Sequence, residues 1–224
     1  MLRIMTENKK ARQSMIDSQI YTNKVENEFV LAVLESVPRE EFVPEKLRGV
    51  AYIDEDLSLG EGRFLMEPMI FARLLQLADI KKAEKVLVVA SSTGYAVAVI
   101  AALAGQVVGL ENNINFISTA QAVLKKLGIT NAAFVKAELD KGAERHKPFD
   151  VIFINGAVET IPPKLFSQLN ENGRIVAIKA DDSSHGPYHA TLIHKHGSVI
   201  SESREFQAFT PKLAELNRKP GFQF

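Results

Sequence analysis

A run of small residues at positions 90–94, Ala-Ser-Ser-Thr-Gly, separates an apolar stretch from a segment of helical pattern. Small side chains in a strand-to-helix turn let a ligand approach backbone N–H groups, and the amino end of the helix favours electron-rich groups. Glu111 ends the next apolar stretch, at a spacing from Gly94 that suits a carboxylate accepting hydrogen bonds from both ribose hydroxyls. Together, the turn and the carboxylate indicate an adenosine-type cofactor site.

A simpler interpretation of the same residues stays open. Only Gly94 is a glycine in this turn, and Ala90 and Ser92 stand at the two other positions where a complete fingerprint has glycine. The local pattern fits an ordinary tight strand-to-helix turn, with Glu111 as a solvated helix-capping acid, as well as it fits a cofactor site.

These residues can meet only if neighbouring strands of one sheet carry them. Continuous apolar stretches predict buried parallel strands, and apolar spacing predicts the helices between them. The expected strands are 85–90, 107–110, 132–136, 150–154 and 174–178, and the expected helices are 96–103, 115–127 and 162–169. Ligands of such sheets bind at the carboxyl ends of the strands.

The fold class that follows is α/β. We expect a doubly wound, mainly parallel sheet with antiparallel C-terminal edge strands between 190 and 209, and an N-terminal helical extension. The chain is expected to be one domain over 1–224, with an N-terminal region at 1–80 and a Rossmann-like core at 81–224.

The N-terminal region combines helices with a long connection. Apolar spacing predicts two amphipathic helices between residues 9 and 37, and a third over 68–78 that Pro68 opens. Residues 38–67 contain several helix breakers and scattered apolar anchors, so we expect an irregular but ordered connection that helps to form the site.

The composition argues against polyanionic partners. The chain has 27 basic and 27 acidic residues and a formal net charge of +0, so no general attraction to nucleic acid or an anionic membrane is expected. It has no cysteine, which excludes disulfides, thiolate zinc sites and cysteine nucleophiles. No apolar run is typical of a signal peptide or a membrane span, and a cytoplasmic location is expected.

Two other groups of polar residues are weaker candidates. His194 and His196 flank Lys195, but no third ligand is near them in the sequence, so we interpret them as surface residues and expect no metal site. Residues 181–185, Asp-Asp-Ser-Ser-His, contain the residue types of a hydrolase triad. Adjacency in sequence is not triad geometry, and a solvated loop is the better interpretation.

Short segments along nearly the whole chain match one family in order. They include Met-Ile-Asp-Ser-Gln at 15–19, Val-Pro-Arg-Glu-Glu-Phe-Val-Pro at 37–44, the stretch 57–68, Thr-Gly-Tyr at 93–95 and Asn-Gly-Arg-Ile-Val at 172–176. The block at 37–44 is characteristic, because its position before the core is not a general property of doubly wound sheets. The chain resembles protein-L-isoaspartate O-methyltransferases, which use S-adenosylmethionine to repair damaged aspartyl and asparaginyl sites in proteins.

The resemblance implies a Rossmann-like methyltransferase fold with S-adenosyl-L-methionine lying across residues 90–94. Glu111 would hold the ribose, Glu138 would meet the adenine where the family usually shows Gly-Asp-Gly, and Asn155 would line the methyl-donor end. The implied cofactor-binding residues are Ala90, Ser92, Gly94, Tyr95, Glu111, Glu138 and Asn155. The implied partners are isoaspartyl-containing proteins or peptides, and the oligomeric state stays open.

Two loops depart from the family pattern. The first strand lacks the family's acidic residue and has Val88 near its end, and Ala90 and Ser92 add side chains in a turn that is usually rich in glycine. In the substrate loop, here residues 60–68, Arg-Phe-Leu-Met follows Gly60-Glu61-Gly62 where the family has glutamine, threonine, isoleucine and serine.

The substrate-loop changes remove hydroxyl groups. Met66 stands at the serine assigned to the active site, and a thioether cannot donate a hydrogen bond. The catalytic residue is therefore left unassigned, and isoaspartyl methylation is expected to be weakened or redirected. A non-catalytic binding module is the alternative. The substrate-loop candidates are Gly60, Gly62, Arg63, Phe64, Met66 and Pro68.

Overall fold

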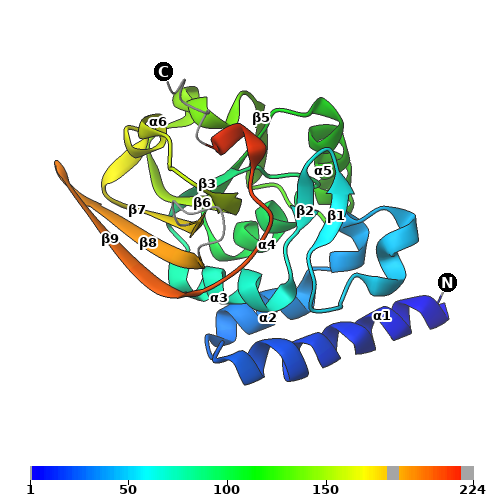
Figure 1. Ribbon diagram of the computed structural model, residues 1–224. Coiled ribbons are helices and arrows are strands. Elements are labelled where there is room, and N and C mark those ends of the chain that lie inside the picture. The colour runs from blue at the N-terminus through cyan, green and yellow to red at the C-terminus, as the bar shows by residue number, and fades with distance from the viewer. Residues whose placement is uncertain (1, 181–186, 218–224) are drawn as a thin grey trace, which may run out of the picture.

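Seven strands of the described residues form one mixed sheet in the computed structural model, which describes residues 2–180 and 187–217 (Figure 1). Their order is β5-β4-β3-β6-β7-β8-β9, with β3 to β7 parallel and β8 and β9 antiparallel. The expected doubly wound sheet with antiparallel edge strands is confirmed. The bounds are β3 Lys85–Val89, β4 Gln106–Glu111, β5 Ala132–Lys136, β6 Phe149–Val158, β7 Leu169–Ala180, β8 Tyr188–His196 and β9 Val199–Gln207.

The chain order reverses beside β3, which pairs with β4 on one side and with β6 on the other. Residues 86–89 of this strand are apolar and fully buried, as expected for a central strand covered on both faces. Such a reversal opens a crevice outside the carboxyl ends of the two neighbouring strands. The residues that follow β3, β4 and β6 are therefore brought to one place.

Helices cover both faces of the sheet (Figure 1). The helix α4 is apolar around its whole circumference because it lies between α2 on one side and strands β3 and β4 on the other. Pro68 opens α3 as predicted, and Asn113 caps α5 by accepting a hydrogen bond from the Asn115 N–H. The bounds are α1 Leu2–Met15, α2 Glu28–Ser36, α3 Pro68–Ala78, α4 Tyr95–Leu103, α5 Ile114–Lys126 and α6 Pro163–Phe166.

The helix predicted over 162–169 is wrong in length, since α6 spans only Pro163–Phe166. The residues that follow α6 pair with the sheet instead of continuing the helix. The Phe149 N–H donates to the Gln168 carbonyl at 2.9 Å, and Leu169 already lies opposite Phe149 in the β6–β7 ladder. As a result β7 begins at Leu169 instead of at residue 174.

Residues 38–67 are more regular than predicted. They contain 3₁₀ turns at Arg39–Phe42 and Glu45–Val50 and an antiparallel hairpin of β1 (Leu57–Gly60) and β2 (Arg63–Leu65). The hairpin was not predicted, because its strands have four and three residues, too few to show an alternating pattern. Its turn, residues 60–62, has positive φ angles throughout.

A C-terminal strap, which we define as residues 208–217, returns from β9 to the carboxyl end of β6 (Figure 1). The Leu213 N–H donates to the Ala157 carbonyl at 2.8 Å, and the Ala157 N–H donates to the Pro211 carbonyl at 3.2 Å. A 3₁₀ turn, Ala214–Leu216, ends the strap. The end of the described chain thus lies at the same edge of the sheet as the ligand crevice.

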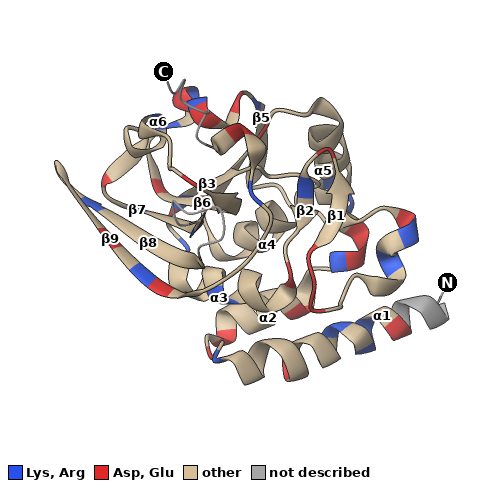
Figure 2. Cartoon of the chain, in the orientation of Figure 1, with Lys and Arg blue, Asp and Glu red and all other residues tan. Residues whose placement is uncertain are grey.

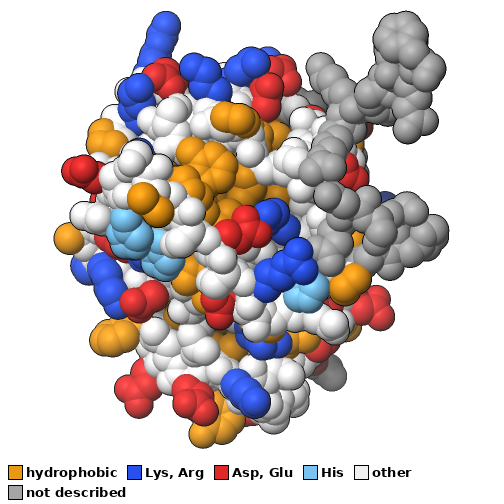
Figure 3. Space-filling view, turned by 60° about the vertical axis from the view of Figure 1, so that its left-hand side comes forward, with side chains coloured by type: hydrophobic (Ala, Val, Ile, Leu, Met, Phe, Trp, Pro, Cys, Tyr) orange, Lys and Arg blue, Asp and Glu red, His pale blue; other side chains and the backbone are white. Residues whose placement is uncertain are grey.

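The described residues contain no helix long and apolar enough to cross a membrane. Charges of both signs are interspersed over the ribbon and over the face that carries β8 and β9 (Figures 2 and 3).

Gly94 provides a test of how tightly the first turn packs. It has φ +94°, and a Cβ there would lie 2.8 Å from the Ala120 Cβ, whereas Gly62 has φ +69° with nothing within 4 Å. Gly94→Ala is expected to lower the free energy of unfolding by about 2–5 kcal/mol, from left-handed strain plus overpacking. Gly62→Ala, which adds strain alone, should cost about 1–2 kcal/mol. Urea unfolding measures both, and equal losses would show that α5 does not press on Gly94.

Candidate functional site

The first loop, residues 90–94, follows β3 at the reversal of chain order. Ala90 and Ser92 have φ angles of +58° and +48°, and Gly94 has +94°. Residues with a side chain rarely adopt this left-handed backbone conformation, in which glycine is the usual residue. The loop therefore keeps the backbone of a glycine-rich turn although two of its three left-handed residues carry side chains. Asn155, from β6, supports it by donating from Nδ2 to the Ala90 carbonyl at 3.0 Å.

Glu111 ends β4 next to this loop and is fully buried. Its Oε2 accepts the Ser92 N–H at 3.0 Å, and its Oε1 accepts the N–H groups of Asn112 at 2.9 Å and Asn113 at 3.3 Å. The interpretation of Glu111 as a solvated acid is therefore wrong. The structure brings together the two features, turn and carboxylate, that the sequence singled out.

Arg63 joins this group from the hairpin, a contact that the sequence did not predict. Its Nε donates to Glu111 Oε2 and its Nη2 to Glu111 Oε1, both at 3.0 Å. Its Nη2 also donates to Glu215 Oε1 in the C-terminal strap at 2.8 Å. The Arg63 side chain is 3% exposed and that of Glu111 is 0% exposed. Burial alone would lower the pKa of Arg63, but the hydrogen bonds and charges of the two carboxylates raise it, so the guanidinium stays charged.

Two other predicted cofactor residues, Glu138 and Tyr95, do not join the cluster around Glu111. Glu138 follows β5, next to the end of β4, and is exposed there. Tyr95 is buried and points into the core instead of the crevice. Its ring lies 5.4 Å from that of Phe42 and 5.3 Å from that of Phe71, and the Arg39 guanidinium lies 5.1 Å from its centre.

Arg39 links the characteristic block at 37–44 to the substrate loop. It is buried, donates from Nε to the Ala51 carbonyl at 2.7 Å, and donates from Nη2 to the Met66 carbonyl. Burial lowers its pKa. Within the loop Met66 is buried and Phe64 is half-buried, so the positions of the family's hydroxyl residues hold apolar side chains.

Three acidic residues gather where the substrate loop enters α3, and sequence analysis did not identify them. Asp56 accepts the Glu67 N–H at 3.0 Å and the Thr210 hydroxyl at 3.1 Å, and Asp54 accepts the Met69 N–H at 3.4 Å. Figure 2 shows acidic residues along the segment that leads into β1. Burial, and next the charges of Asp54 and Asp56, raise the pKa of Glu67 to about 7.

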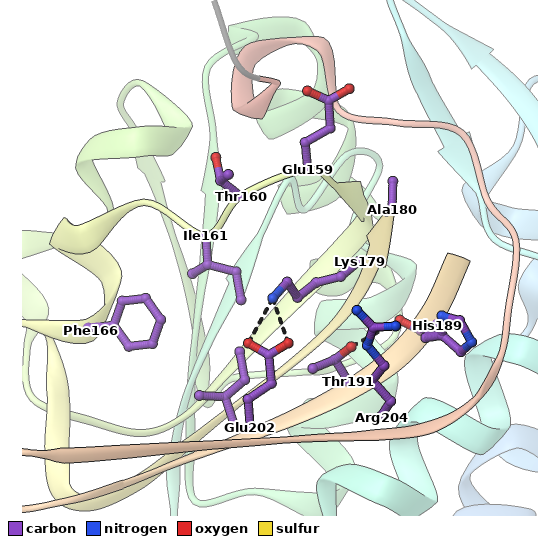
Figure 4. Close-up of a pocket in the computed structure, with 11 residues that line it drawn as sticks. Glu159, Thr160, Ile161, Phe166, Lys179, Ala180, His189, Thr191, Glu202 and Arg204 are labelled. Atoms are coloured by element: carbon purple, nitrogen blue, oxygen red, sulfur yellow. Dashed lines mark hydrogen bonds and ion pairs between the residues drawn. The ribbon is translucent and has the colours of Figure 1, made fainter. Parts of the chain in front are cut away.

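Two cavities lie in this part of the structure, and one of them touches the first loop. One of about 270 Å³ is lined by Thr93 of the first loop together with Phe42, Leu59 and Phe116, and the Thr93 hydroxyl donates to the Phe42 carbonyl at 2.7 Å. Another, of about 330 Å³, lies against β7, β8 and β9 (Figure 4). None of the predicted cofactor residues lines this second cavity.

Two charged groups that line the second cavity form an ion pair between β7 and β9. Figure 4 shows Lys179 and Glu202 pointing toward each other, and the Lys179 Nζ lies 2.6 and 2.7 Å from the two Glu202 oxygens.

No group of three or more potential metal ligands occurs in residues 2–180 and 187–217. The rings of His194 and His196 stack 5.8 Å apart on β8, and His196 is exposed. The acidic and hydroxyl run at 181–185 lies outside the described residues.

A family model described as Protein-L-isoaspartate(D-aspartate) O-methyltransferase (PCMT) matches residues 9–212 of this chain. The chain belongs to this family. The prediction from the sequence segments is confirmed, and with it the enzyme class and the dependence on S-adenosylmethionine that the family implies. Nothing in the comparisons favours the non-catalytic alternative.

Similar proteins share the family name. A protein-L-isoaspartate O-methyltransferase of Koribacter versatilis is 39% identical over 165 residues, which cover 74% of each chain. One of Aliivibrio fischeri (strain MJ11) is 32% identical over 204 residues, covering 91% of this chain and 97% of its own. The similarity to these family members therefore extends over most of the chain.

Solved structures agree with the fold. A protein-L-isoaspartate O-methyltransferase superimposes with a TM-score of 0.77 at 22% identity, covering 92% of this chain and 67% of its own. A beta-aspartate methyltransferase from Plasmodium falciparum, in complex with S-adenosyl-L-homocysteine, has a TM-score of 0.76 at 19% identity, covering 91% and 98%. These similarities show a common Rossmann-like methyltransferase fold.

The family's cofactor does not fit the conformation described here. A ribose needs acceptors for its hydroxyls, and the two Glu111 oxygens already receive donors from Arg63 and from three backbone N–H groups. The fold and the position of the carboxylate match the family, whereas the place beside that carboxylate is filled by the chain itself.

Glu67 should make stability depend on pH. Its pKa is about 7 in the folded chain against an ordinary 4.5, so the folded state keeps a proton that the unfolded state releases. The contribution of Glu67 to stability therefore falls as the pH rises from about 4.5 to about 7 and stays at its low value above that. Glu67→Gln, which is neutral throughout, should raise the melting temperature at pH 8 and change it little at pH 4.5.

Glu61→Gln, on the exposed turn of the same loop, is the control. It should change the melting temperature by the same small amount at pH 4.5 and at pH 8. A gain from Glu67→Gln that is the same at pH 4.5 and pH 8 would contradict the raised pKa.

Proposed function

We propose that the protein is an S-adenosylmethionine-dependent methyltransferase that acts on the carboxylate of isoaspartyl residues in damaged proteins or peptides. The observation that carries this proposal is the position of Glu111. The carboxylate lies at the end of β4, hydrogen-bonded to a left-handed loop, where the chain order of a doubly wound sheet reverses. That place is where such folds bind nucleotide-type ligands, and the family match extends through it.

The proposed division of the site follows the elements. The first loop and Glu111 would bind the cofactor, with Glu138 just after β5 and Asn155 within β6. The cofactor supplies the methyl electrophile, and the protein has to align the acceptor with it. The acceptor side would be formed by the substrate loop, whose main chain Arg39 holds at the Met66 carbonyl.

The side chains of the substrate loop support a slow or redirected reaction. Phe64 and Met66 cannot donate the hydrogen bonds of the threonine and serine that the family shows there. The nearby acids Asp54, Asp56 and Glu67 add negative charge next to the loop, which would repel a carboxylate acceptor above neutral pH. An acceptor with neighbouring basic residues would suit this surface better.

We also propose that residues 1–80 and 81–224 act as one catalytic unit. Met15 and Tyr52 of the first part belong to the same buried cluster as Tyr95 and Val97 of the second. A cytoplasmic location is proposed as the simplest setting for the repair of intracellular proteins.

A methyl-transfer assay tests the function. With radiolabelled S-adenosylmethionine and a synthetic isoaspartyl peptide, the wild-type protein should form a base-labile methyl ester. The rate should be roughly 100-fold below that of the Aliivibrio fischeri relative if that protein carries the hydroxyl-bearing loop, because one missing hydrogen-bond donor costs about that much. The same peptide with a normal aspartyl residue is the control.

Phe64→Thr combined with Met66→Ser tests the substrate loop separately. We expect little recovery from this pair alone, and more when Ala90 and Ser92 are returned to glycine, since glycine adopts their left-handed φ without strain. Full activity of the first pair alone would show that the cofactor loop is intact. Bound cofactor without any methyl transfer in all variants would favour the non-catalytic module.

A further inference from the structure

The hydrogen bonds of Glu111 leave no acceptor position for a further ligand. Three come from the backbone N–H groups of Ser92, Asn112 and Asn113, and two come from Arg63. A carboxylate has about four lone-pair positions, and the five donors already share all of them. A ribose with two hydroxyl donors can be added only if two of the present donors leave.

Arg63 supplies the two donors that can be exchanged. The three backbone donors belong to the first loop and to the residues just after β4, which the sheet fixes in place. The Arg63 Nε–H and Nη2–H instead come from a side chain, and each reaches one Glu111 oxygen. A vicinal diol presents the same pattern, with one hydroxyl for each oxygen of the carboxylate. The guanidinium thus makes the contacts that a ribose would make.

Arg63 is held from a second side by the C-terminal strap. Its Nη1 and Nη2 donate to the two oxygens of Glu215 at 3.3 and 2.8 Å, and Nη2 also donates to the Asn112 side chain at 3.1 Å. Glu215 is 30% exposed, so this side of the guanidinium is the one open to water. The strap and the hairpin together keep Arg63 over Glu111.

We infer that Arg63 is an internal competitor of the cofactor ribose, and that it sets the affinity of this chain for S-adenosylmethionine. In the absence of cofactor the guanidinium neutralises the buried Glu111. Cofactor binding requires the Arg63 side chain to leave the carboxylate toward the open side at Glu215, and the ribose hydroxyls then take its place. This inference rests on the proposed function, since it assumes that the site accepts an adenosine-type ligand.

Removing the competitor should strengthen binding. Titration calorimetry with S-adenosyl-L-homocysteine compares the wild-type protein with Arg63→Gln, which carries the residue that the family shows at this position. The variant is expected to bind about tenfold more tightly or better, equivalent to about 1.4 kcal/mol. Its melting temperature without ligand should be lower than that of the wild type, because Glu111 loses its counter-charge, and the ligand should raise it more.

Two further variants keep the test valid if Arg63→Gln folds poorly. Arg63→Lys retains the charge but cannot span both carboxylate oxygens, so its affinity should be intermediate. Glu215→Gln removes the charge of the strap's carboxylate while leaving the Arg63–Glu111 pair, and should give a smaller gain.

Arg174→Gln is the matched control for the loss of a two-pronged arginine pair. Arg174 donates from Nη1 and Nη2 to the two Glu84 oxygens, both at 2.8 Å, and their side chains are 13% and 18% exposed. This pair lies before β3, at the opposite end of the strand from the first loop. Its loss should lower the melting temperature without changing the affinity for S-adenosyl-L-homocysteine.

A direct readout of Arg63 separates this inference from the proposed function. The Nε–H resonance of Arg63, assigned by its loss in Arg63→Gln, should shift when S-adenosyl-L-homocysteine saturates the wild-type protein. The ligand could bind with an unchanged Arg63 resonance and with equal affinity for wild type and variant. That result would refute the inference that Arg63 competes with the ribose, but not the proposed function. No binding by any variant at millimolar ligand would overturn both. A gain in Arg174→Gln equal to that in Arg63→Gln would show a general loosening instead of local competition.

Discussion

The ion pair of Arg63 with Glu111 holds the ligand edge of this molecule together. Four segments meet at it: the hairpin through Arg63, the end of β4 through Glu111, the first loop through the Ser92 N–H, and the C-terminal strap through Glu215. Because both partners are buried, removing one leaves a charge without compensation and costs about 3–5 kcal/mol. The arrangement of the substrate loop and that of the cofactor loop therefore depend on each other.

The elements that carry the site could be predicted, because their signal is local. The apolar run at 85–90 and the acid that follows the run at 107–110 place the first loop beside Glu111 once a parallel sheet is assumed. No local sequence pattern predicts the ion pair of Arg63, because its partner Glu111 lies 48 residues further along the chain. An arginine after a Gly-Glu-Gly turn has the pattern of a solvated residue, and only the packing of the hairpin onto the core buries it.

The block at 37–44 was identified by resemblance alone, and the structure gives it a physical role. Arg39 is buried with carbonyl partners at Ala51 and Met66, and its guanidinium lies over the ring of Tyr95. The same block is fixed to the first loop by the hydrogen bond from the Thr93 hydroxyl to the Phe42 carbonyl. Since unpaired polar groups are costly in the interior, these contacts fix the position of the N-terminal region against the sheet.

The strap also has a consequence for how the protein is made. Glu215 lies 152 residues after Arg63, so a ribosome that adds about 5–20 residues per second produces it roughly 8–30 s later. Glu111 is made 48 residues after Arg63, so until residue 215 is added Arg63 has at most one of its two carboxylates. The contact between Arg63 and the strap can therefore form only after all the strands of the described sheet have been synthesised.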